Sequence, residues 1–462
     1  MKDNLTFSSF SSDILYEFDK NSSFSGIFSF SIELQHINLL DIYSLLIDQF
    51  NFSIFWEENN NNSFIALDKC KQISIDSPNR FKVAKNFNDQ TLKNIINLNN
   101  HAKYSSISKI FYFFSFSNKS TKELRKNKAP ILEGVLPKIL ITNDGKKTLL
   151  RMNLEISSKS SINDYLHEFW SIKNQIISKK NKKEKLDVKK MSIKNFDLCF
   201  YDSHKLLSQK ISKAINLINN GYIDKLVIAS RLIIKIKEKL NLISILKKLK
   251  INQPNSCRYV WKRGKRNIIF GASPEKLFSY NQKTLTLEAI AGTAENGNDL
   301  AISLKNDKNL REHNFVINYL IESLKFLKID QFRKEKLKLK KFGNIVHLYT
   351  EINADIENIC PFVLLDILHP SPAVCGYPKE KALQYIDIIE NFDRGNYASP
   401  FGWVDFNGNA DFRVALRGAK IINQDIEFIA GSGLVSGSVC SKEIAEIKLK
   451  FNSIANQIFD TF

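Results

Sequence analysis

The chain has 462 residues and is 43% hydrophobic, which supplies a full core for one large domain or for two or three ordinary ones. Its six cysteines show neither CxxC nor metal-type spacing, so the sequence predicts no disulfide framework and no zinc site, as expected in a reducing cytoplasm. Residues 1–20 lack a continuous apolar segment, and no later run of about 18 apolar residues follows. Neither secretion nor a membrane span is therefore expected.

A net charge of +19 is the kind of basic footprint that nucleic-acid-binding proteins carry. The lysines of this chain occur singly or in two runs, residues 179–190 and 333–341, within a sequence rich in Asn and Ile. That mixture is typical of AT-rich coding bias, in which lysine takes ordinary surface positions. We therefore expect no nucleic-acid partner, and the charge retains only a weak role in attracting an anionic substrate.

Residues 1–190 alternate weakly between apolar and polar positions, as short strands of an antiparallel sheet do. They contain no chemical motif, and the lysine run at 179–190 predicts an exposed connection. After it, apolar residues at helical spacing over 204–221 end in Asn-Asn-Gly, a signal for the C-terminus of a helix. The apolar stretch 221–235 then predicts a buried strand, with the charged side chain of Lys225 at its head.

The middle of the chain continues with dense turn signals. Residues 271–280, "GASPEKLFSY", predict a strand that meets a Ser-Pro turn, and residues 285–297 predict a strand that ends at a glycine. An amphipathic helix is expected over 310–327, with Glu312 in its first turns. Residues 345–356 alternate between apolar and polar positions and predict another strand.

The C-terminal part closes with a loop, a hairpin and a helix. A loop broken by Pro and Gly leads into a helix within 368–390, and residues 401–421 predict a hairpin that turns at Asn-Gly. A strand and glycine turn at 428–438 precede a closing helix over 441–451. Three polar residues lie on one face of this helix: Glu443, Glu446 and Lys450.

Each of these features has an ordinary structural interpretation when it is taken alone. The polar face of the closing helix is typical of a solvated surface, and the glycine turn at 428–438 lacks the Lys-Ser/Thr pair of a phosphate loop. Glu275 after Ser-Pro is typical of an acid at a helix N-terminus. Lys225 is typical of a strand-edge lysine whose charged end reaches water. No single feature identifies a functional site.

The order and spacing of the motifs together resemble the chorismate-utilising enzymes, most closely their isochorismate synthase branch. The resemblance covers about residues 205–455 and rests on DKLVIASR, GASPEKL, LEAIAGT, REH, HLYT, LHPSPAVCGYPKEKAL, RGNYASPFGW, VALRGA, AGSGLVSGS and EIAEIKLK. It implies an α/β (α+β) fold with two large, mostly antiparallel sheets flanked by helices around a central active site. The strand-rich part, residues 1–190, would then be integral to the same domain as the chorismate-binding catalytic region, residues 191–462.

The resemblance also assigns ligands for a metal and for the substrate. The residues that match the family's Mg²⁺ ligands are Glu312, Glu446 and, directly or through water, Glu443. Hard oxygen ligands suit this cation, which would grip the ring carboxylate of the substrate. The residues that match substrate contacts are Gly292, Thr293, Tyr397, Arg417, Gly431 and Lys450. Arg417 and Lys450 match the residues that hold the enolpyruvyl carboxylate, for which a guanidinium offers a planar fork.

Two further residues match the family's catalytic groups. Lys225 matches the general base, which takes a proton from water as the water attacks C2 of the ring, and Glu275 matches the general acid, which protonates the departing C4 hydroxyl on the opposite face. The base must be neutral near pH 7, which an apolar strand end beside a metal ion favours. The acid must stay protonated, which a closed site crowded with substrate carboxylates favours.

Small departures within the motifs separate the branches of the family. Anthranilate synthases carry Gln at the position of Lys225 and need an amidotransferase, and aminodeoxychorismate synthases commonly carry Lys at the position of Ala291. Salicylate synthases share Lys225 and Glu275 but tend to have Thr where this chain has Ala373. We therefore expect an isomerase, an isochorismate synthase that feeds menaquinone or siderophore biosynthesis. Salicylate synthase and an enzyme like anthranilate synthase component I are the alternatives.

The same resemblance predicts the partners. Chorismate is the expected small anionic substrate, and we expect a cytoplasmic monomer with no obligatory amidotransferase, no nucleic acid and no membrane association. A function of another class stays open, because a catalytically retired relative or a basic RNA-associated protein would share the charge and the motif-poor N-terminal part. The joint presence of acid, base and metal positions argues against it.

Overall fold

The computed structural model describes residues 6–21, 23–58, 63–99, 108–118, 130–156, 159–179, 196–238, 240–296 and 307–459. No helix in these ranges is long and apolar enough to cross a membrane. The cysteines whose side chains are described form no disulfide, in agreement with the expectation from their spacing; they are Cys70, Cys257, Cys360, Cys375 and Cys440.

One run of paired strands crosses the molecule from end to end. In pairing order its strands are β4 (Ile95–Asn97), β1 (Ile27–Gln35), β7 (Lys147–Glu155), β6 (Leu132–Asn143), β3 (Ser63–Ile75), β2 (Phe52–Glu57), β10 (Cys257–Arg263), β11 (Asn267–Ser273), β20 (Gly418–Ile422), β21 (Asp425–Val435) and β9 (Lys225–Ile236). Two further strands share the other edge of β9: β17 (Gly376–Tyr377) and β8 (Phe196–Tyr201). Within the described ranges every pair is antiparallel except β1–β4.

A second sheet branches from the first at β6. Its strands, in pairing order from β6, are β5 (Lys109–Phe114), β18 (Pro400–Asp405), β19 (Ala410–Val414), β12 (Lys276–Asn281), β13 (Thr284–Glu295) and β16 (Ile345–Asp355), with β14 (Arg333–Lys334) and β15 (Lys338–Phe342) both on β16. One edge of β6 pairs with β3, and its other edge pairs first with β5 and then with β7. The expected two antiparallel sheets are therefore present and are joined through β6 into one system of 21 strands.

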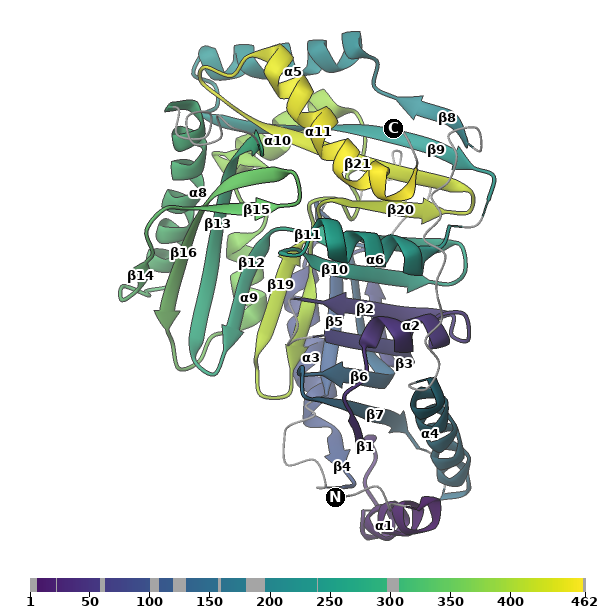
Figure 1. Cartoon of the computed structure of the whole chain (residues 1–462). Helices are drawn as coiled ribbons and strands as arrows, with labels where there is room; N and C mark the ends of the chain where they lie inside the picture. The colour runs from purple at the N-terminus through teal and green to yellow at the C-terminus, as the bar shows by residue number, and fades with distance from the viewer. Residues whose placement is uncertain are drawn as a thin grey trace.

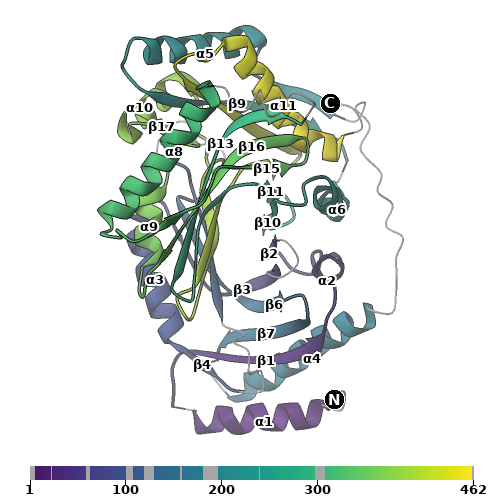
Figure 2. The same ribbon diagram turned by 60° about the vertical axis from the view of Figure 1, so that its left-hand side comes forward.

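Helices cover the outer faces of the two sheets. Their bounds are α1 Phe7–Lys20, α2 Leu39–Leu46, α3 Arg80–Lys93, α4 Lys159–Lys179, α5 His204–Asn219, α6 Leu242–Asn252, α8 Asp307–Phe326, α9 Pro361–Leu368, α10 Lys379–Glu390 and α11 Cys440–Ile458. Figure 1 shows α1 and α4 at one end of the molecule and α5, α10 and α11 at the other. In Figure 2 the sheets face each other, with α3, α8 and α9 along one side and α2, α4 and α6 along the other.

Local sequence explains how the chain enters β9. The Ser203 hydroxyl accepts a hydrogen bond from the backbone N–H of Leu206, which caps the first turn of α5. The helix ends just before Gly221, whose φ of +74° is a left-handed conformation that glycine adopts at little cost. The β-branched and aliphatic residues of β9 are buried against both neighbours, as strand propensity predicts. The end of α5, the turn at Gly221 and the strand-forming residues that follow together set the start of β9 at Lys225.

The predicted elements after residue 200 are confirmed, with bounds that shift by a few residues. The helices expected at 204–221 and 310–327 are α5 and α8, and the closing helix extends beyond the predicted 441–451 as α11. In the N-terminal part the expected strands are present, but the helices α1 to α4 were not predicted. The exposed connection expected at 179–190 lies almost wholly outside the described residues.

Candidate active site

A cavity lies between the two sheets, under α8 and α11. Its apolar wall comes mainly from β13, β21 and α11, with one residue of β9 and the loop after α9; it includes Val227, Ile290, Val374, Phe428 and Phe451. Only a few ionisable or hydroxyl groups reach it: Glu275, Thr293, Glu312, His347, Tyr397, Arg417 and Lys450. An apolar enclosure with a small set of placed polar groups is typical of a site for a small molecule.

Lys225 is fully buried at the start of β9. Its Nζ lies 3.2 Å from Oε1 of Glu312 on α8, a residue that lines the cavity. Burial lowers the pKa of Lys225 because it penalises the ammonium, and the neighbouring Glu312 carboxylate only partly opposes this effect. The side chain is therefore a buried amine beside the cavity, and the strand-edge interpretation, which needs the charged end in water, is wrong.

Glu275 lies in the turn between β11 and β12 and is also buried. The Ser273 hydroxyl holds this turn, because it accepts a hydrogen bond from the Glu275 N–H at 3.3 Å and donates one to the Val414 carbonyl at 2.6 Å. Burial raises the pKa of Glu275 to about 7, although the positive charge of Lys225 acts in the opposite direction. Near neutral pH a large fraction of this carboxyl group is protonated.

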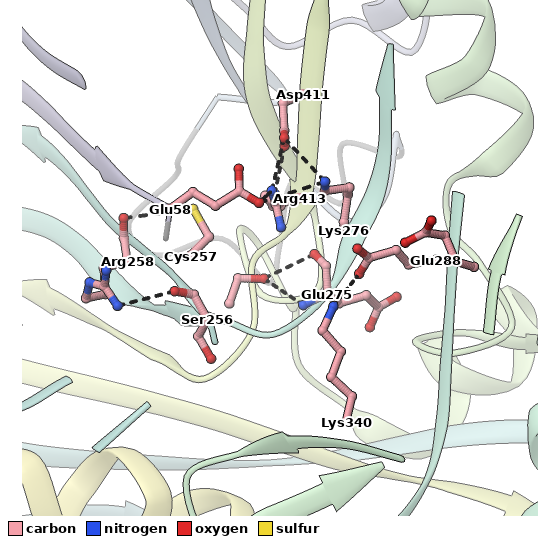
Figure 3. A network of polar contacts seen from close by, with 12 residues as sticks. Glu58, Ser256, Cys257, Arg258, Glu275, Lys276, Glu288, Lys340, Asp411 and Arg413 are labelled. Carbon is pink, nitrogen blue, oxygen red and sulfur yellow. Dashed lines mark hydrogen bonds and ion pairs between the residues drawn. The ribbon is translucent and has the colours of Figure 1, made fainter. Parts of the chain in front are cut away.

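Lys276, the residue after Glu275, lies in a separate network of ion pairs. Figure 3 shows Glu275 beside a network of polar contacts in which Lys276 approaches Glu58 and Asp411, and Arg413 binds both of these acids. The network neutralises its own charges. It leaves the Glu275 carboxyl group on the cavity side without an ion pair among the described residues, which is why burial dominates its pKa.

Three glutamates and one lysine gather where α8 meets α11. The ammonium of Lys308 lies 3.1 Å from Glu443 Oε1 and 3.7 Å from Glu312 Oε2, and Glu446 adds a third nearby negative charge. The Glu443 carboxylate also accepts a hydrogen bond from the Ser432 hydroxyl at 2.5 Å. Burial opposes ionisation of Glu312, but the charges of Lys225, Lys308 and Lys450 outweigh it and lower the pKa of Glu312 to about 2.

This cluster has the donor chemistry of a site for a hard divalent cation. Its possible donor atoms are carboxylate oxygens, and the ammonium of Lys308 already lies between two of the three acids. Within the described ranges no three acidic, His or Cys side chains are arranged as a ready metal site. Binding of a cation by Glu312, Glu443 and Glu446 would therefore require Lys308 to move away.

One end of the cavity is cationic. Arg417, whose backbone has a left-handed φ of +49°, donates from Nη2 to Nε2 of His347 at 3.3 Å. Burial lowers the pKa of His347 to about 3, so the ring is neutral, and its Nδ1 donates to the Gly292 carbonyl at 3.1 Å. Lys450 donates to the Gly431 carbonyl at 2.8 Å and to Glu446 Oε1 at 2.6 Å. The two cations are thus fixed in position by neutral partners and one acid.

Two glycines are required by close approach at this site. A Cβ atom on Gly433 would lie 2.3 Å from Glu312 Oε1, so any larger residue at this position would displace that carboxylate. Gly292 has a φ of +72° at the irregularity where β13 shifts its register against β16. This bulge exposes the backbone of residues 291–293 to the cavity.

Most of the residues that the sequence singled out meet at this one site. The cavity wall contains Glu275, Gly292, Thr293, Glu312, Tyr397, Arg417, Gly431 and Lys450. Lys225 and Glu446 lie behind it, in contact with the wall residues Glu312 and Lys450, and Glu443 is joined to Glu312 through Lys308. His347 and Lys308 were not predicted from the sequence. Lys308 precedes Glu312 by one helical turn, a spacing that indicates an ion pair, and His347 was within a quoted motif without an assigned role.

The fold and site define a cavity suited to a small anion, with a buried lysine, an acid of raised pKa and fixed cations around it. Residues 13–459 match the family model described as "Chorismate binding enzyme", so the chain belongs to this family.

Individual known proteins and a solved structure are also similar to this chain. An isochorismate synthase, MenF, of Haemophilus influenzae is 27% identical over 325 residues, which are 68% of this chain and 72% of the relative. The "Salicylate biosynthesis isochorismate synthase" of Pseudomonas aeruginosa is 32% identical over 254 residues, and this alignment spans 53% of each chain. The solved structure of MenF, the menaquinone-specific isochorismate synthase of Escherichia coli, superposes with a TM-score of 0.75 at 21% identity over 97% of this chain and 99% of that one. At this identity the superposition establishes the fold.

Proposed function

We propose that the chain is an isochorismate synthase, an isomerase that adds water at C2 of chorismate and releases the C4 hydroxyl. The observation that carries the proposal is the pair of oppositely perturbed groups at one cavity. Lys225 has a lowered pKa and Glu275 has a pKa raised to about 7. A base that can be neutral and an acid that can be protonated at the same pH are what this reaction needs.

In the proposed reaction each group has one task. The Lys225 amine accepts a proton from water as the water oxygen forms its bond to C2. Both ring double bonds shift by one position, the bond between C4 and its oxygen breaks, and Glu275 donates the proton with which that oxygen leaves as water. One water is consumed and one is released, so the product is an isomer of the substrate.

The cationic end of the cavity supports binding of one carboxylate group of the substrate. Arg417 offers a planar fork, and His347 fixes one of its nitrogens at 3.3 Å. Lys450 adds a second positive charge, and the irregularity of β13 presents the backbone around Gly292 and Thr293 to the same space. We assign the enolpyruvyl carboxylate to this end, with the ring of Tyr397 against the substrate.

Mg²⁺ is the proposed cofactor, held by Glu312, Glu446 and Glu443. When bound it supplies a hard positive centre for the ring carboxylate of the substrate. The carboxylate oxygens around Lys308 support this assignment because they already stabilise a cation.

The branch and pathway are part of the proposal. Ala373 lines the cavity at the position where salicylate synthases tend to have Thr, which supports release of isochorismate without loss of pyruvate. The relatives include enzymes named for menaquinone, salicylate and vibriobactin synthesis, so either menaquinone or siderophore biosynthesis is a fitting destination.

The test is turnover of chorismate by the purified chain with MgCl₂ alone, followed by chromatography of the products. We expect isochorismate in reversible equilibrium with chorismate, without glutamine, ammonia or a second subunit, and no turnover in excess EDTA. Salicylate as the main product would move the chain to another branch, and anthranilate formed with ammonium would do the same. Absence of any turnover, combined with salt-dependent RNA binding, would favour a non-enzymatic role.

A further inference from the structure

Among the described residues, the edge of β9 that faces away from β21 has no continuous partner strand. β17 pairs only with Lys225 and Leu226, and β8 begins its pairing at Leu232. Between these two short partners, the backbone groups of Val227 and Ala229 need other hydrogen-bond partners because the strand is buried. The Val227 N–H finds one in the Cys375 carbonyl at 2.8 Å.

A buried ion pair fills the remaining gap. Glu390 and Arg394 are almost completely buried, with side chains 0% and 2% exposed. The Glu390 carboxylate accepts the Ala229 N–H at 2.7 Å, and Arg394 Nη2 donates to the Val227 carbonyl at 2.9 Å. Arg394 also binds Glu390 through Nε at 2.9 Å and through Nη2 at 2.5 Å. The pair therefore makes the backbone contacts that a neighbouring strand would make.

The same guanidinium reaches a third segment. Arg394 Nη1 donates to the Val374 carbonyl at 2.7 Å, in the loop between α9 and α10. Both backbone carbonyls that Arg394 binds belong to residues of the cavity wall, since Val227 and Val374 line it. Val227 is two residues after Lys225 on one strand, so the two side chains share a face of the sheet.

We infer that Glu390 and Arg394 are positioning residues, which hold the strand that carries Lys225 against the adjacent loop at Val374 and so fix this part of the cavity wall. This role rests on the proposed function of Lys225. Burial of an ion pair carries a large desolvation penalty. This pair contributes instead by fixing geometry, because the planar guanidinium of Arg394 binds one carboxylate and two backbone carbonyls at once. A lysine at position 394 would keep the charge but could not make these contacts together.

Arg394→Lys is therefore the decisive variant. A displacement of about 1 Å at a catalytic group can cost on the order of 10²-fold in rate, so we expect kcat to fall by about 10- to 100-fold at 25 °C in protein that is still folded. The matched control is Arg258→Lys, since Arg258 is also buried and binds Glu57 at 2.9 Å, but lies outside the cavity wall. Its kcat should stay within about threefold of the parent value. If Arg394→Lys does not fold, the double variant Glu390→Gln/Arg394→Gln replaces it, because it leaves no unpaired buried charge.

Hydrogen exchange supplies a readout that is independent of turnover. Amide exchange of peptides that contain Val227 and Ala229 should become at least tenfold faster in the Arg394 variant, with peptides of β2 and β10 unchanged. A variant with a lower melting temperature but with parental kcat and parental exchange in these peptides would overturn the inference. If the parent protein does not convert chorismate, the proposed function fails, and exchange alone then decides whether the pair holds β9.

Discussion

The amine of Lys225 and the carboxylate of Glu312 lie 3.2 Å apart, although the two residues are on different elements, β9 and α8. The contact joins the proposed base to a proposed metal ligand. Gly433 makes room for it, because the position of its missing side chain lies beside both Glu312 and the Lys225 stem. The base and the metal cluster are therefore parts of one packed unit.

Replacement of Lys225 by Gln should affect the chemical step only. Gln can still donate a hydrogen bond to Glu312, and the proposed substrate contacts come from Arg417 and Lys450, so fold and substrate binding should persist. Loss of a general base typically costs on the order of 10²–10⁴-fold in kcat, with little change in KM. Steady-state kinetics should be compared with Lys210→Gln, in which another buried lysine, paired with Asp202 at 2.9 Å, is replaced. A kcat of Lys225→Gln within about threefold of the parent value would refute the role of Lys225 as general base.

Replacement of Glu275 by Gln should stabilise the protein at alkaline pH while it lowers activity. The pKa of Glu275 is raised from 4.5 to about 7, so its favourable contribution to folding is complete below pH 4.5 and is lost as pH rises through 7. Above pH 7 the charged, buried group costs up to about 3 kcal/mol, at about 1.36 kcal/mol for each pKa unit. Urea unfolding at pH 5 and pH 8 should show the Gln variant gaining stability relative to the parent as pH rises. If the difference in unfolding free energy between variant and parent is the same at pH 5 and at pH 8, the raised pKa of Glu275 is contradicted.

Gly433→Ala should weaken Mg²⁺ binding while it leaves the stability of the fold almost unchanged. The added Cβ would meet Glu312 Oε1 at 2.3 Å, and a flexible carboxylate can move away at little cost to the fold. We expect a loss of at least about tenfold in Mg²⁺ affinity by titration calorimetry, because a displaced ligand no longer meets its cation. Gly264→Ala is the control, since no atom lies within 4 Å of its Cβ but its φ is +97°. It should lose about 1 kcal/mol of stability and keep its Mg²⁺ affinity.

Lys308→Met should make the fold depend on added cation. Lys308 neutralises Glu312 and Glu443, which would otherwise repel each other in a buried cluster. Without Mg²⁺ the variant should melt several degrees below the parent, and MgCl₂ should raise its melting temperature more than that of the parent. Lys340→Met, which removes the partner of Glu288 at 3.3 Å, should show no such added response. Equal responses to MgCl₂ in Lys308→Met and in the parent would show that the cluster does not take up the cation.

Sequence patterns predicted the elements that carry the site better than the contacts between them. The strand that begins at Lys225 and the helix with Glu446 follow from local periodicity, which depends on neighbours in sequence. The buried state of Glu390 and Arg394 could not be predicted in this way, because a Glu and an Arg four residues apart usually indicate an exposed pair near a helix end. Their burial results from β9 having an incomplete edge, a fact of three-dimensional pairing.

The N-terminal helices show a second limit. α2 has eight residues, mostly apolar, and such a short run is equally consistent with a buried strand. The branch of the sheets at β6 depends on pairings such as Ser63 with Asn143 and Phe113 with Glu133, of which no local pattern gives a sign. The roles of Glu443 and Lys308 likewise depend on the approach of α11 to α8.

The way the N-terminal strands pair with the later ones limits how far the chain can be truncated. β2 covers the edge of β10, and β5 covers the edge of β18, so both sheets of the catalytic region end on strands that come from residues before 190. A fragment of residues 191–462 would expose two long apolar strand edges at once, and open edges of this kind recruit one another between molecules. Shortening the chain would therefore yield aggregates in place of a minimal enzyme, and a useful truncation has to remove loops while it leaves β2, β3, β5 and β6 in place.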